Sequence, residues 1–314
     1  MAFAGIQPDL VFDLGFHRGE DTGYYLALGR RVVAVDANAE LIMAGHQRFA
    51  AAIAAQRLIL VNAALVGSRQ RDAHQDIDFY PHPTHSEWGS VDQRWVRRNA
   101  EAHGLPHSDP VRVPTLSLME MVLCYGCPGF LKIDIEGSDE AVLADLEQLE
   151  VRPTTVSWET GKESLRHVLR QHRRMEDLGY GRFRVVQQAF LSHTPPAPCP
   201  DGSQWLFEDG CSGPLPELSP QAWESRWLVA WRYRWLFLAY ALVGPRSWFR
   251  ALARQRSPWI AAGPRWVQGW AARHQFPLPG WVDSHALLTD PHRGSGAARG
   301  SGYEVVGQMA RAWQ

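Results

Sequence analysis

The sequence has few cysteines and lacks the patterns that mark a secreted chain. Four cysteines in 314 residues are too few for a disulfide scaffold. Cys124 and Cys127 form one C-x-x-C pair without partners at zinc-ligand spacing, so we expect reduced thiols and no bound metal. The start of the chain has no basic segment followed by an apolar one. These absences predict a cytoplasmic protein.

Long apolar runs are also missing. The stretch from Leu236 to Val243 is apolar but too short to span a bilayer, and two arginines interrupt any longer window. Hydrophobic residues make up 45% of the chain and charged residues 21%, as in globular proteins with a sizeable core. A chain of 314 residues favours a core domain with an appendage. We predict a core domain over residues 1–208 and an extension over 209–314.

Acidic residues are almost absent from part of this extension. Residues 221–275 contain nine Arg, no Lys and one acid, Glu224, which gives them a formal charge of +8. The whole chain carries −1, so the remainder carries −9. Eleven of the fourteen Trp follow residue 200. The extension therefore presents a different kind of surface from the front of the chain.

The front of the chain contains a strand, a glycine turn and a helix in succession. An apolar run with Asp13 near its end leads into Gly15-x-x-x-Gly19, where glycine permits a tight turn and close approach of a ligand. A second apolar run, from Val32, ends at Asp36, whose carboxylate can accept hydrogen bonds from both hydroxyls of a ribose. This arrangement is typical of a nucleotide-like ligand bound at the carboxyl ends of parallel strands.

The residue at position 17 discriminates between two such ligands. A dinucleotide fingerprint needs a glycine there so that the pyrophosphate can touch the backbone, and the chain has His17. S-adenosylmethionine has no pyrophosphate and is favoured. An NAD(P)-dependent oxidoreductase, a non-catalytic module that binds an adenosyl ligand, and a tight turn without any ligand remain as alternatives.

Further strand and helix patterns extend this unit. Residues 37–56 have the periodicity of a helix, and the apolar run from Arg57 to Asn62 predicts a third strand. Repeated strand–helix–strand units indicate a mostly parallel sheet with helices on both faces. Ala37, Asn62 and Ala63 follow strand ends and are candidates for contacts with the ligand. Residues 81–107 predict a long loop with some helix, containing the solvated histidines His82 and His85.

A second polar stretch follows the strand that begins at Pro128. Strand alternation places Lys132, Asp134 and Glu136 on one face. They form either a buried pair of lysine and acid that only fixes geometry or, as we favour, part of the ligand site with Asp134 at its rim. Residues 139–149 predict the following helix.

The chain after residue 150 contains one more predicted strand that ends in an acid. Residues 154–159 predict a strand that ends at Glu159, and residues 163–178 a helix. Residues 183–190 and 203–207 have the pattern of the last two strands of the sheet.

Four segments together resemble the FkbM-type methyltransferases: Asp13-Leu14-Gly15, the run ending at Asp36, Leu131 to Gly137, and Ser157-Trp158-Glu159. The resemblance covers about residues 8–190. It implies a seven-stranded, Rossmann-like fold and a methyltransferase that depends on S-adenosylmethionine and usually acts on an oxygen. It further implies that Asp13, Gly15 and Gly19 hold the methionine portion of the donor, Asp36 its ribose, and Asp134 and Glu136 the mouth of the site.

Transfer to an alcohol benefits from a general base close to the acceptor oxygen. The candidates, in order, are Asp134, Glu159, His17 and His285. His17 has a second interpretation as a hydrogen-bond donor of the loop. Asp134 and Glu159 together are an alternative site for a divalent cation.

The extension begins with a helix signal at Ser219-Pro220 and ends it at Gly244-Pro245. Trp223, Trp227, Trp231 and Trp235 recur every four residues within it. This stripe predicts a core helix, a helix in a membrane interface over residues 220–256, or a homodimer contact. Nucleic-acid binding is not expected, because stacking platforms usually lie on sheets or in channels.

We therefore predict an O-methyltransferase. Its donor is S-adenosylmethionine, and its acceptor is a hydroxyl of a glycan, a lipid-linked sugar or a secondary metabolite.

Overall fold

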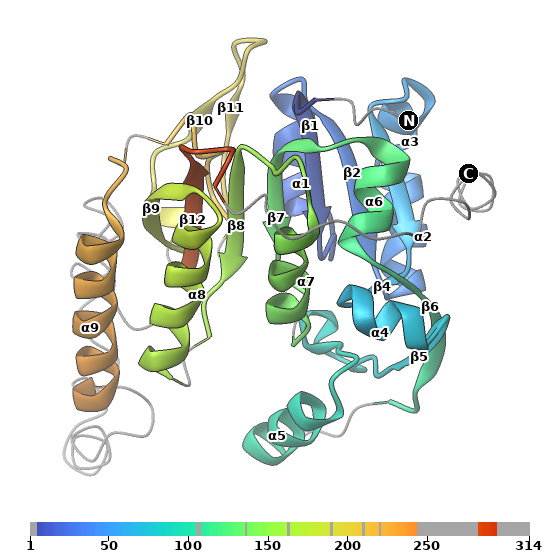
Figure 1. The fold of residues 1–314 in the computed structure, drawn as a ribbon. Helices are drawn as coiled ribbons and strands as arrows, with labels where there is room; N and C mark the ends of the chain where they lie inside the picture. Colours follow the sequence, from blue (N-terminus) through green and yellow to red (C-terminus); the bar gives the residue numbers. More distant parts are fainter. Residues whose placement is uncertain are drawn as a thin grey trace. The chain divides into compact units, whose positions relative to one another are not determined.

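The computed structural model alternates strands and helices (Figure 1). Seven strands form the central sheet in the order β3-β2-β1-β7-β8-β12-β9, which confirms the predicted mostly parallel α/β fold. The chain divides into two compact units, residues 1–156 with 291–314 and residues 157–290. The residues that the structure describes are 5–104, 108–135, 137–161, 164–188, 191–208, 211–219, 221–243 and 282–293.

The first unit contains four parallel strands of the sheet. They are β1 (Gln7–Leu14), β2 (Arg31–Asp36), β3 (Leu58–Asn62) and β7 (Pro128–Ile133). β1 lies between β2 and β7. The apolar runs of these strands are buried, as expected for parallel strands covered on both faces. Their carboxyl ends, at Leu14, Asp36, Asn62 and Ile133, therefore lie at one edge of the sheet.

Helices connect these strands, with one break that the sequence did not predict. α1 (Glu20–Ala27) follows β1. The single helix predicted over residues 37–56 is instead two helices, α2 (Ala39–Arg48) and α3 (Ala50–Ala54). Phe49 interrupts them with φ −110° and ψ 23°, and its ring packs edge-on against Phe16 at 6.1 Å between centroids. The break thus directs an aromatic ring toward the turn after β1.

A small three-stranded sheet follows, in the order β4-β6-β5. Its strands are β4 (Ala64–Leu65), β5 (Asp76–Phe79) and β6 (Val111–Leu116), and its helices are α4 (Ser68–Ala73), η1 (Ser86–Trp88) and α5 (Gln93–His103). The predicted loop over residues 81–107 thus contains two short helical elements. α6 (Leu118–Tyr125) then leads to β7, and α7 (Asp139–Asp145) with η2 (Leu146–Gln148) follows β7, so the helix predicted to Leu149 ends earlier.

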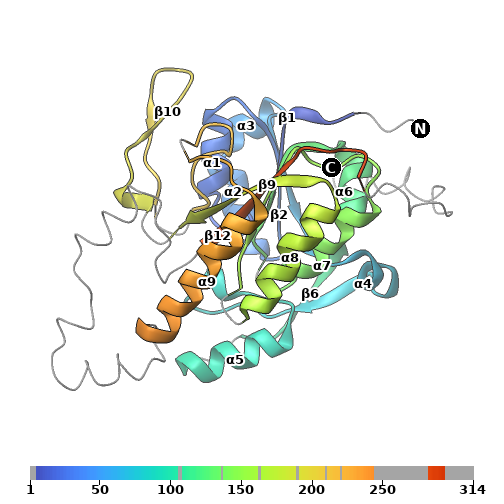
Figure 2. The same cartoon turned by 60° about the vertical axis from the view of Figure 1, so that its left-hand side comes forward.

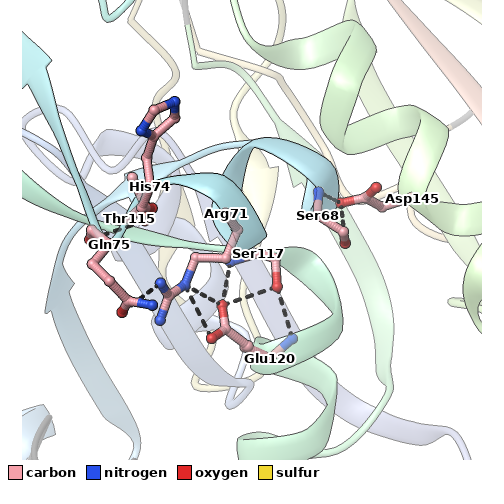
Figure 3. A network of polar contacts seen from close by, with 8 residues as sticks. All are labelled: Ser68, Arg71, His74, Gln75, Thr115, Ser117, Glu120 and Asp145. Carbon is pink, nitrogen blue, oxygen red and sulfur yellow. Dashed lines mark hydrogen bonds and ion pairs between the residues drawn. The ribbon is translucent and has the colours of Figure 1, made fainter. Parts of the chain in front are cut away.

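A polar network fixes α4 to its neighbours (Figure 3). Arg71 donates from Nε to both carboxylate oxygens of Glu120, at 2.9 and 3.1 Å. Glu120 also accepts from the backbone nitrogen of Ser117 at 2.9 Å, which completes the capping box at the start of α6. Asp145 of α7 accepts from the backbone nitrogen of Ser68 at 2.8 Å. One short helix is therefore held by charged partners on two others.

The second unit completes the sheet with a strand from far along the chain. β8 (Thr155–Glu159) leads into this unit, and α8 (Leu165–Asp177), β9 (Tyr180–Gln187) and η3 (Leu191–His193) follow. β12 (Val282–Leu288) lies between β8 and β9 and pairs antiparallel with β9. The prediction that residues 203–207 form a strand of this sheet is wrong, because among the described residues β11 (Gln204–Trp205) belongs to a separate two-stranded sheet with β10 (Ala197–Pro198).

α9 (Arg226–Val243) packs against α8 and β9 within this unit (Figure 2). It begins seven residues after the predicted start at Ser219. Trp223 therefore precedes the helix, and the guanidinium carbon of Arg184 lies 4.0 Å from the centroid of its ring. The predicted extension over 209–314 contributes both α9 and β12 among its described residues. No described helix is long and apolar enough to cross a membrane.

A buried polar cluster joins α8, α9 and β12. Ser284 Oγ lies 3.1 Å from Nε2 of His172 and 2.6 Å from the hydroxyl of Tyr233, and Thr160 Oγ1 lies within 2.9 Å of both hydroxyls. His172 donates from Nδ1 to the carbonyl of Val168, so its Nε2 accepts from Ser284. Burial lowers the pKa of His172 to about 4. The ring is therefore neutral at neutral pH.

Candidate functional site

Lys132 is the centre of a buried ion cluster where β1 and β7 lie side by side. Its Nζ is 3.2 Å from Asp13 Oδ1, 3.1 Å from Asp21 Oδ2 and 3.7 Å from Asp134 Oδ2. Burial alone would lower the pKa of Lys132, but the three carboxylates outweigh it and hold this pKa well above its usual value. One ammonium thus faces three carboxyl groups, and burial raises the pKa of two of them, Asp13 and Asp134.

Asp13 is fully buried, and both of its oxygens have protein partners. Thr22 Oγ1 donates to Oδ2 at 2.6 Å, and Lys132 binds Oδ1. These bonds connect β1 to the first turn of α1 and to β7. The geometry gives Asp13 a positioning role, and its direct contact with a donor stays a prediction.

The two glycines of the turn serve packing. Gly15 has φ +94°, and a Cβ there would lie 1.8 Å from the carbonyl oxygen of Asp134. Gly19 has φ +77°, and a Cβ there would lie 2.6 Å from ring atoms of both Phe16 and Phe49. Both positions require glycine because of backbone conformation and neighbouring atoms, and their contact with a donor stays a prediction.

Asp36 organises the ends of β2 and β3. Its Oδ2 accepts from the backbone nitrogen of His17 and its Oδ1 from that of Asn38, each at 2.8 Å. Asn62 donates from Nδ2 to the carbonyls of Asp36 and Ala37, at 3.0 and 3.2 Å, and the nitrogen of Ala63 donates to the Asp36 carbonyl at 3.1 Å. Burial raises the pKa of Asp36. The structure therefore brings the predicted residues together around Asp36, with His17 at its carboxylate and Asn62 and Ala63 at its backbone carbonyl.

His17 connects the turn to η1. The residue has φ +50°, which is uncommon outside glycine. Its Nε2 lies 2.9 Å from Ser86 Oγ, and its Nδ1 lies 3.4 Å from Glu20 Oε1. Both ring nitrogens have partners, so this geometry fits the structural interpretation of His17. A catalytic role stays a prediction.

Asp134 is the most open carboxylate of the Lys132 cluster. It follows the end of β7, and its nitrogen donates to the carbonyl of Leu14 at 2.9 Å. Its side chain is partly exposed, whereas Asp13 and Asp21 are buried. Burial raises the pKa of Asp134, and the nearby Lys132 opposes this shift. A carboxylate with a raised pKa that solvent still reaches is suited to accept a proton.

Carboxylates also accept hydrogen bonds from backbone amides around this edge of the sheet. Asp139 accepts from the nitrogens of Ile135 and Gly137, at 3.1 and 3.2 Å. Glu20 accepts from the nitrogen of Arg18 at 3.2 Å. Together with the two amides bound by Asp36, these are the groups that would otherwise hold an anion at helix N-termini. These backbone amides therefore already have carboxylate acceptors within the chain.

Glu136 lies outside the described residues. Glu159 ends β8 in the second unit, and its catalytic role stays a prediction. His285 is buried in β12, where burial lowers its pKa to about 3, so the structure argues against it as a base that reaches an acceptor. His82 is buried and not solvated, since its Nδ1 accepts from the nitrogen of His85 at 3.0 Å.

Among the described residues, no group of three or more His, Cys, Asp or Glu is placed so that it could hold a metal ion. The alternative of a divalent cation between Asp134 and Glu159 stays a prediction.

Four residues of the site were not predicted from the sequence. Asp21 and Thr22 occupy the first turn of α1, Ser86 contacts His17, and Asp139 caps the backbone after β7. Acidic residues are common in the first turn of a helix because they interact favourably with the helix dipole. An acid at position 21 therefore gives no specific indication of its ion pair with Lys132. Lys132 is buried and ion-paired, and its nearest acids are Asp13 and Asp21 rather than Asp134; the favoured role of this cluster in a ligand site stays a prediction.

This region matches a known protein family. A family model described as the methyltransferase FkbM domain matches residues 13–181, more than half of the chain. No curated protein matches the chain.

Proposed function

The chain belongs to the FkbM methyltransferase family, and from this premise we propose that it uses S-adenosylmethionine to methylate a hydroxyl oxygen. The family match supports a methyltransferase. The choice of donor and of acceptor atom is our inference from the site.

The excess of carboxylates around Lys132 is the observation that carries the choice of donor. S-adenosylmethionine bears a positive sulfonium and an α-ammonium group, and an environment with Asp13, Asp21 and Asp134 around one ammonium favours such charges. A dinucleotide would bring a pyrophosphate. It would meet this negative cluster, and the amides that bind phosphate elsewhere already donate to Asp36 and Asp139. The site chemistry therefore supports the methyl donor over NAD(P).

We assign the ribose of the donor to Asp36. Each carboxylate oxygen accepts one backbone amide and can accept another hydrogen bond. Ala37, Asn62 and Ala63 would form the wall next to it, since Asn62 and Ala63 donate to the backbone carbonyls of Asp36 and Ala37. The methionine portion is assigned to the turn at Gly15 and to the carboxylates near Lys132.

When bound, the donor supplies a methyl group that is already activated as a sulfonium. The protein then has to align the acceptor and remove its proton. We assign proton removal to the carboxylate of Asp134, because it is the carboxylate of the cluster that solvent reaches. Lys132 keeps that carboxylate in place and limits the rise of its pKa.

For the acceptor we propose a hydroxyl of a glycan, a lipid-linked sugar or a secondary metabolite. We propose a cytoplasmic location, consistent with four cysteines that all occur as free thiols. Mass spectrometry of methylated products from cells with and without the protein would identify the acceptor.

Titration calorimetry with purified full-length protein tests the donor. We expect binding of S-adenosylmethionine and S-adenosylhomocysteine and none of NAD or NADP. Binding of a nicotinamide dinucleotide alone would contradict the proposal. Donor binding without methyl transfer to any hydroxyl in cell extracts would instead support the non-catalytic module.

A further inference from the structure

α9 exposes a ridge of tryptophans on the side away from its packing partners. The exposed fractions are 68% for Trp227, 54% for Trp231 and 51% for Trp235. Leu228 and Leu238 are exposed beside them. Tryptophan is rarely left this open, since one side chain has 150–250 Å² to bury in general. A contiguous apolar surface of this kind indicates an interaction site.

The opposite face of α9 explains why the ridge is directed outward. Val229, Ala230, Tyr233 and Leu236 are buried against the second unit. The hydroxyl of Tyr233 also joins the buried cluster with Ser284, at 2.6 Å. One face of α9 is therefore held in place by packing. The exposed residues, three or four positions apart along the helix, lie together on the other face, where a partner can contact them.

The ridge is accompanied by positive charge only. α9 contains no acidic residue, and Arg234 is exposed beside Trp231 and Trp235. Two other arginines of the helix are neutralised within the unit, Arg226 by Glu176 at 2.7 Å and Arg232 by Glu224 at 2.7 Å. The sequence that follows the helix, residues 244–275, adds six Arg and no acid.

We propose that the α9 ridge, formed by Trp227, Leu228, Trp231, Trp235 and Leu238, lies in the interface of an anionic lipid bilayer. Tryptophan favours this interface because its ring is largely apolar while its N–H reaches polar headgroups. Exposed arginine without neighbouring acids is attracted to anionic headgroups. α9 lies on the bilayer surface in this arrangement, since no described helix is long and apolar enough to cross.

A second copy of the chain fits the same ridge less well. A symmetric dimer through the α9 ridge would bring Arg234 of both copies together, and α9 offers no acidic partner. Helix pairs also prefer aliphatic side chains such as leucine, isoleucine and valine at their contact positions, which interlock more closely than three tryptophans. Charge and side-chain shape therefore favour the bilayer.

Co-sedimentation of the full chain with vesicles tests the proposal. One set of vesicles contains phosphatidylcholine alone, and the other contains equal parts of phosphatidylcholine and phosphatidylglycerol. We expect wild-type protein to sediment with the anionic vesicles and more weakly with the neutral ones. The triple variant W227S/W231S/W235S should bind the anionic vesicles at least about tenfold more weakly.

The matched control replaces exposed leucines elsewhere in the same unit. Leu206 and Leu218 are 72% and 51% exposed, and the variant L206S/L218S should sediment like the wild type. R234Q should weaken binding only to the anionic vesicles. If circular dichroism shows that the triple variant is unfolded, W231S alone replaces it in the comparison.

The proposal is overturned if the wild type sediments with neither set of vesicles. It is also overturned if the folded tryptophan variant sediments with the anionic vesicles as strongly as the wild type. Light scattering then identifies the alternative partner. A wild-type dimer that the tryptophan variant converts to a monomer, without vesicle binding, assigns the ridge to a second copy.

Discussion

The backbone nitrogen of His17 donates a hydrogen bond to Oδ2 of Asp36 over 2.8 Å. His17 belongs to the turn after β1, and Asp36 ends β2, so this bond fastens the turn to the neighbouring strand end, next to the bonds from the nitrogens of Gly15 and Phe16 to the carbonyl of Val35. The other oxygen of Asp36 binds the nitrogen of Asn38 before α2. The carboxylate thus shapes the same edge of the sheet at which we place the ribose.

Replacing Asp36 by alanine removes both the proposed ribose acceptor and the support of the turn. We expect D36A to weaken binding of S-adenosylmethionine at least about tenfold, as for loss of a charged hydrogen-bond partner. Titration calorimetry measures this change. The control is D78A, which removes a carboxylate of the same unit that pairs with Arg112 on the surface. Equal donor affinity of D36A and D78A would remove Asp36 from the site.

Asparagine at position 134 keeps the shape of the side chain but cannot accept a proton. We expect D134N to lower kcat about a hundredfold or more, the usual contribution of a general base, while donor affinity falls by a smaller factor because Asp13 and Asp21 still face Lys132. In the wild type, kcat should fall as the pH drops through the raised pKa of Asp134, because protonation inactivates the carboxylate. The residual kcat of D134N should not show this fall at low pH. Full activity of D134N would assign Asp134 to structure alone.

Gly15 and Gly29 form a matched pair for testing close approach at the strand ends. Both have positive φ, +94° at Gly15 and +77° at Gly29. A Cβ at Gly15 would lie 1.8 Å from the carbonyl oxygen of Asp134, whereas a Cβ at Gly29 would have no atom within 4 Å. G29A should therefore cost about 1 kcal/mol, for the backbone conformation alone. G15A should cost more than about 3 kcal/mol, because steric overlap is added. Urea unfolding of both variants measures the difference, and equal losses would contradict the close approach of Gly15 to the Asp134 carbonyl.

His172 makes the stability of the second unit depend on pH. Burial lowers its pKa from 6.5 to about 4 in the folded chain. The unfolded chain therefore takes up a proton first as the pH falls below 6.5, and the folded state loses stability until about pH 4. H172Q removes this one titration. Between pH 6.5 and pH 5 we expect the free energy of unfolding of the variant to fall by about 2 kcal/mol less than that of the wild type.

Denaturant unfolding at several pH values measures this difference between the two proteins. The variant H167Q, in the same helix α8, is the control because His167 is not buried, and it should lose stability like the wild type. Parallel curves for the wild type and H172Q would contradict a neutral, buried His172.

The local patterns of the sequence predicted most of the sheet. The ends of β1, β2, β3 and β8 agree with the predictions within a few residues, because parallel strands buried on both faces produce continuous apolar runs. The start of α9 was predicted too early, because Glu224, two residues before the helix, pairs through its backbone with Phe183 of β9. That contact joins distant segments and leaves no local pattern.

The site was predicted as a set of strand ends, but its pairings were not. Asp36 and Asn62 are both recognisable from their positions after apolar runs, and the structure joins them through the carbonyl of Asp36. The pair of Asp21 and Lys132 spans more than a hundred residues of sequence. Such pairs depend on the registration of β1 with β7, which side-chain periodicity does not specify.

The position of β12 between β8 and β9 has a consequence for biosynthesis. During translation, the ribosome must extend past Leu288 before the nascent polypeptide can fill this gap, although both flanking strands have emerged about a hundred residues earlier. Until then β9 presents unpaired main-chain groups, the kind of edge that recruits other polypeptides into aggregates. Premature termination anywhere between α9 and β12 would therefore leave a truncated product prone to aggregation and chaperone capture.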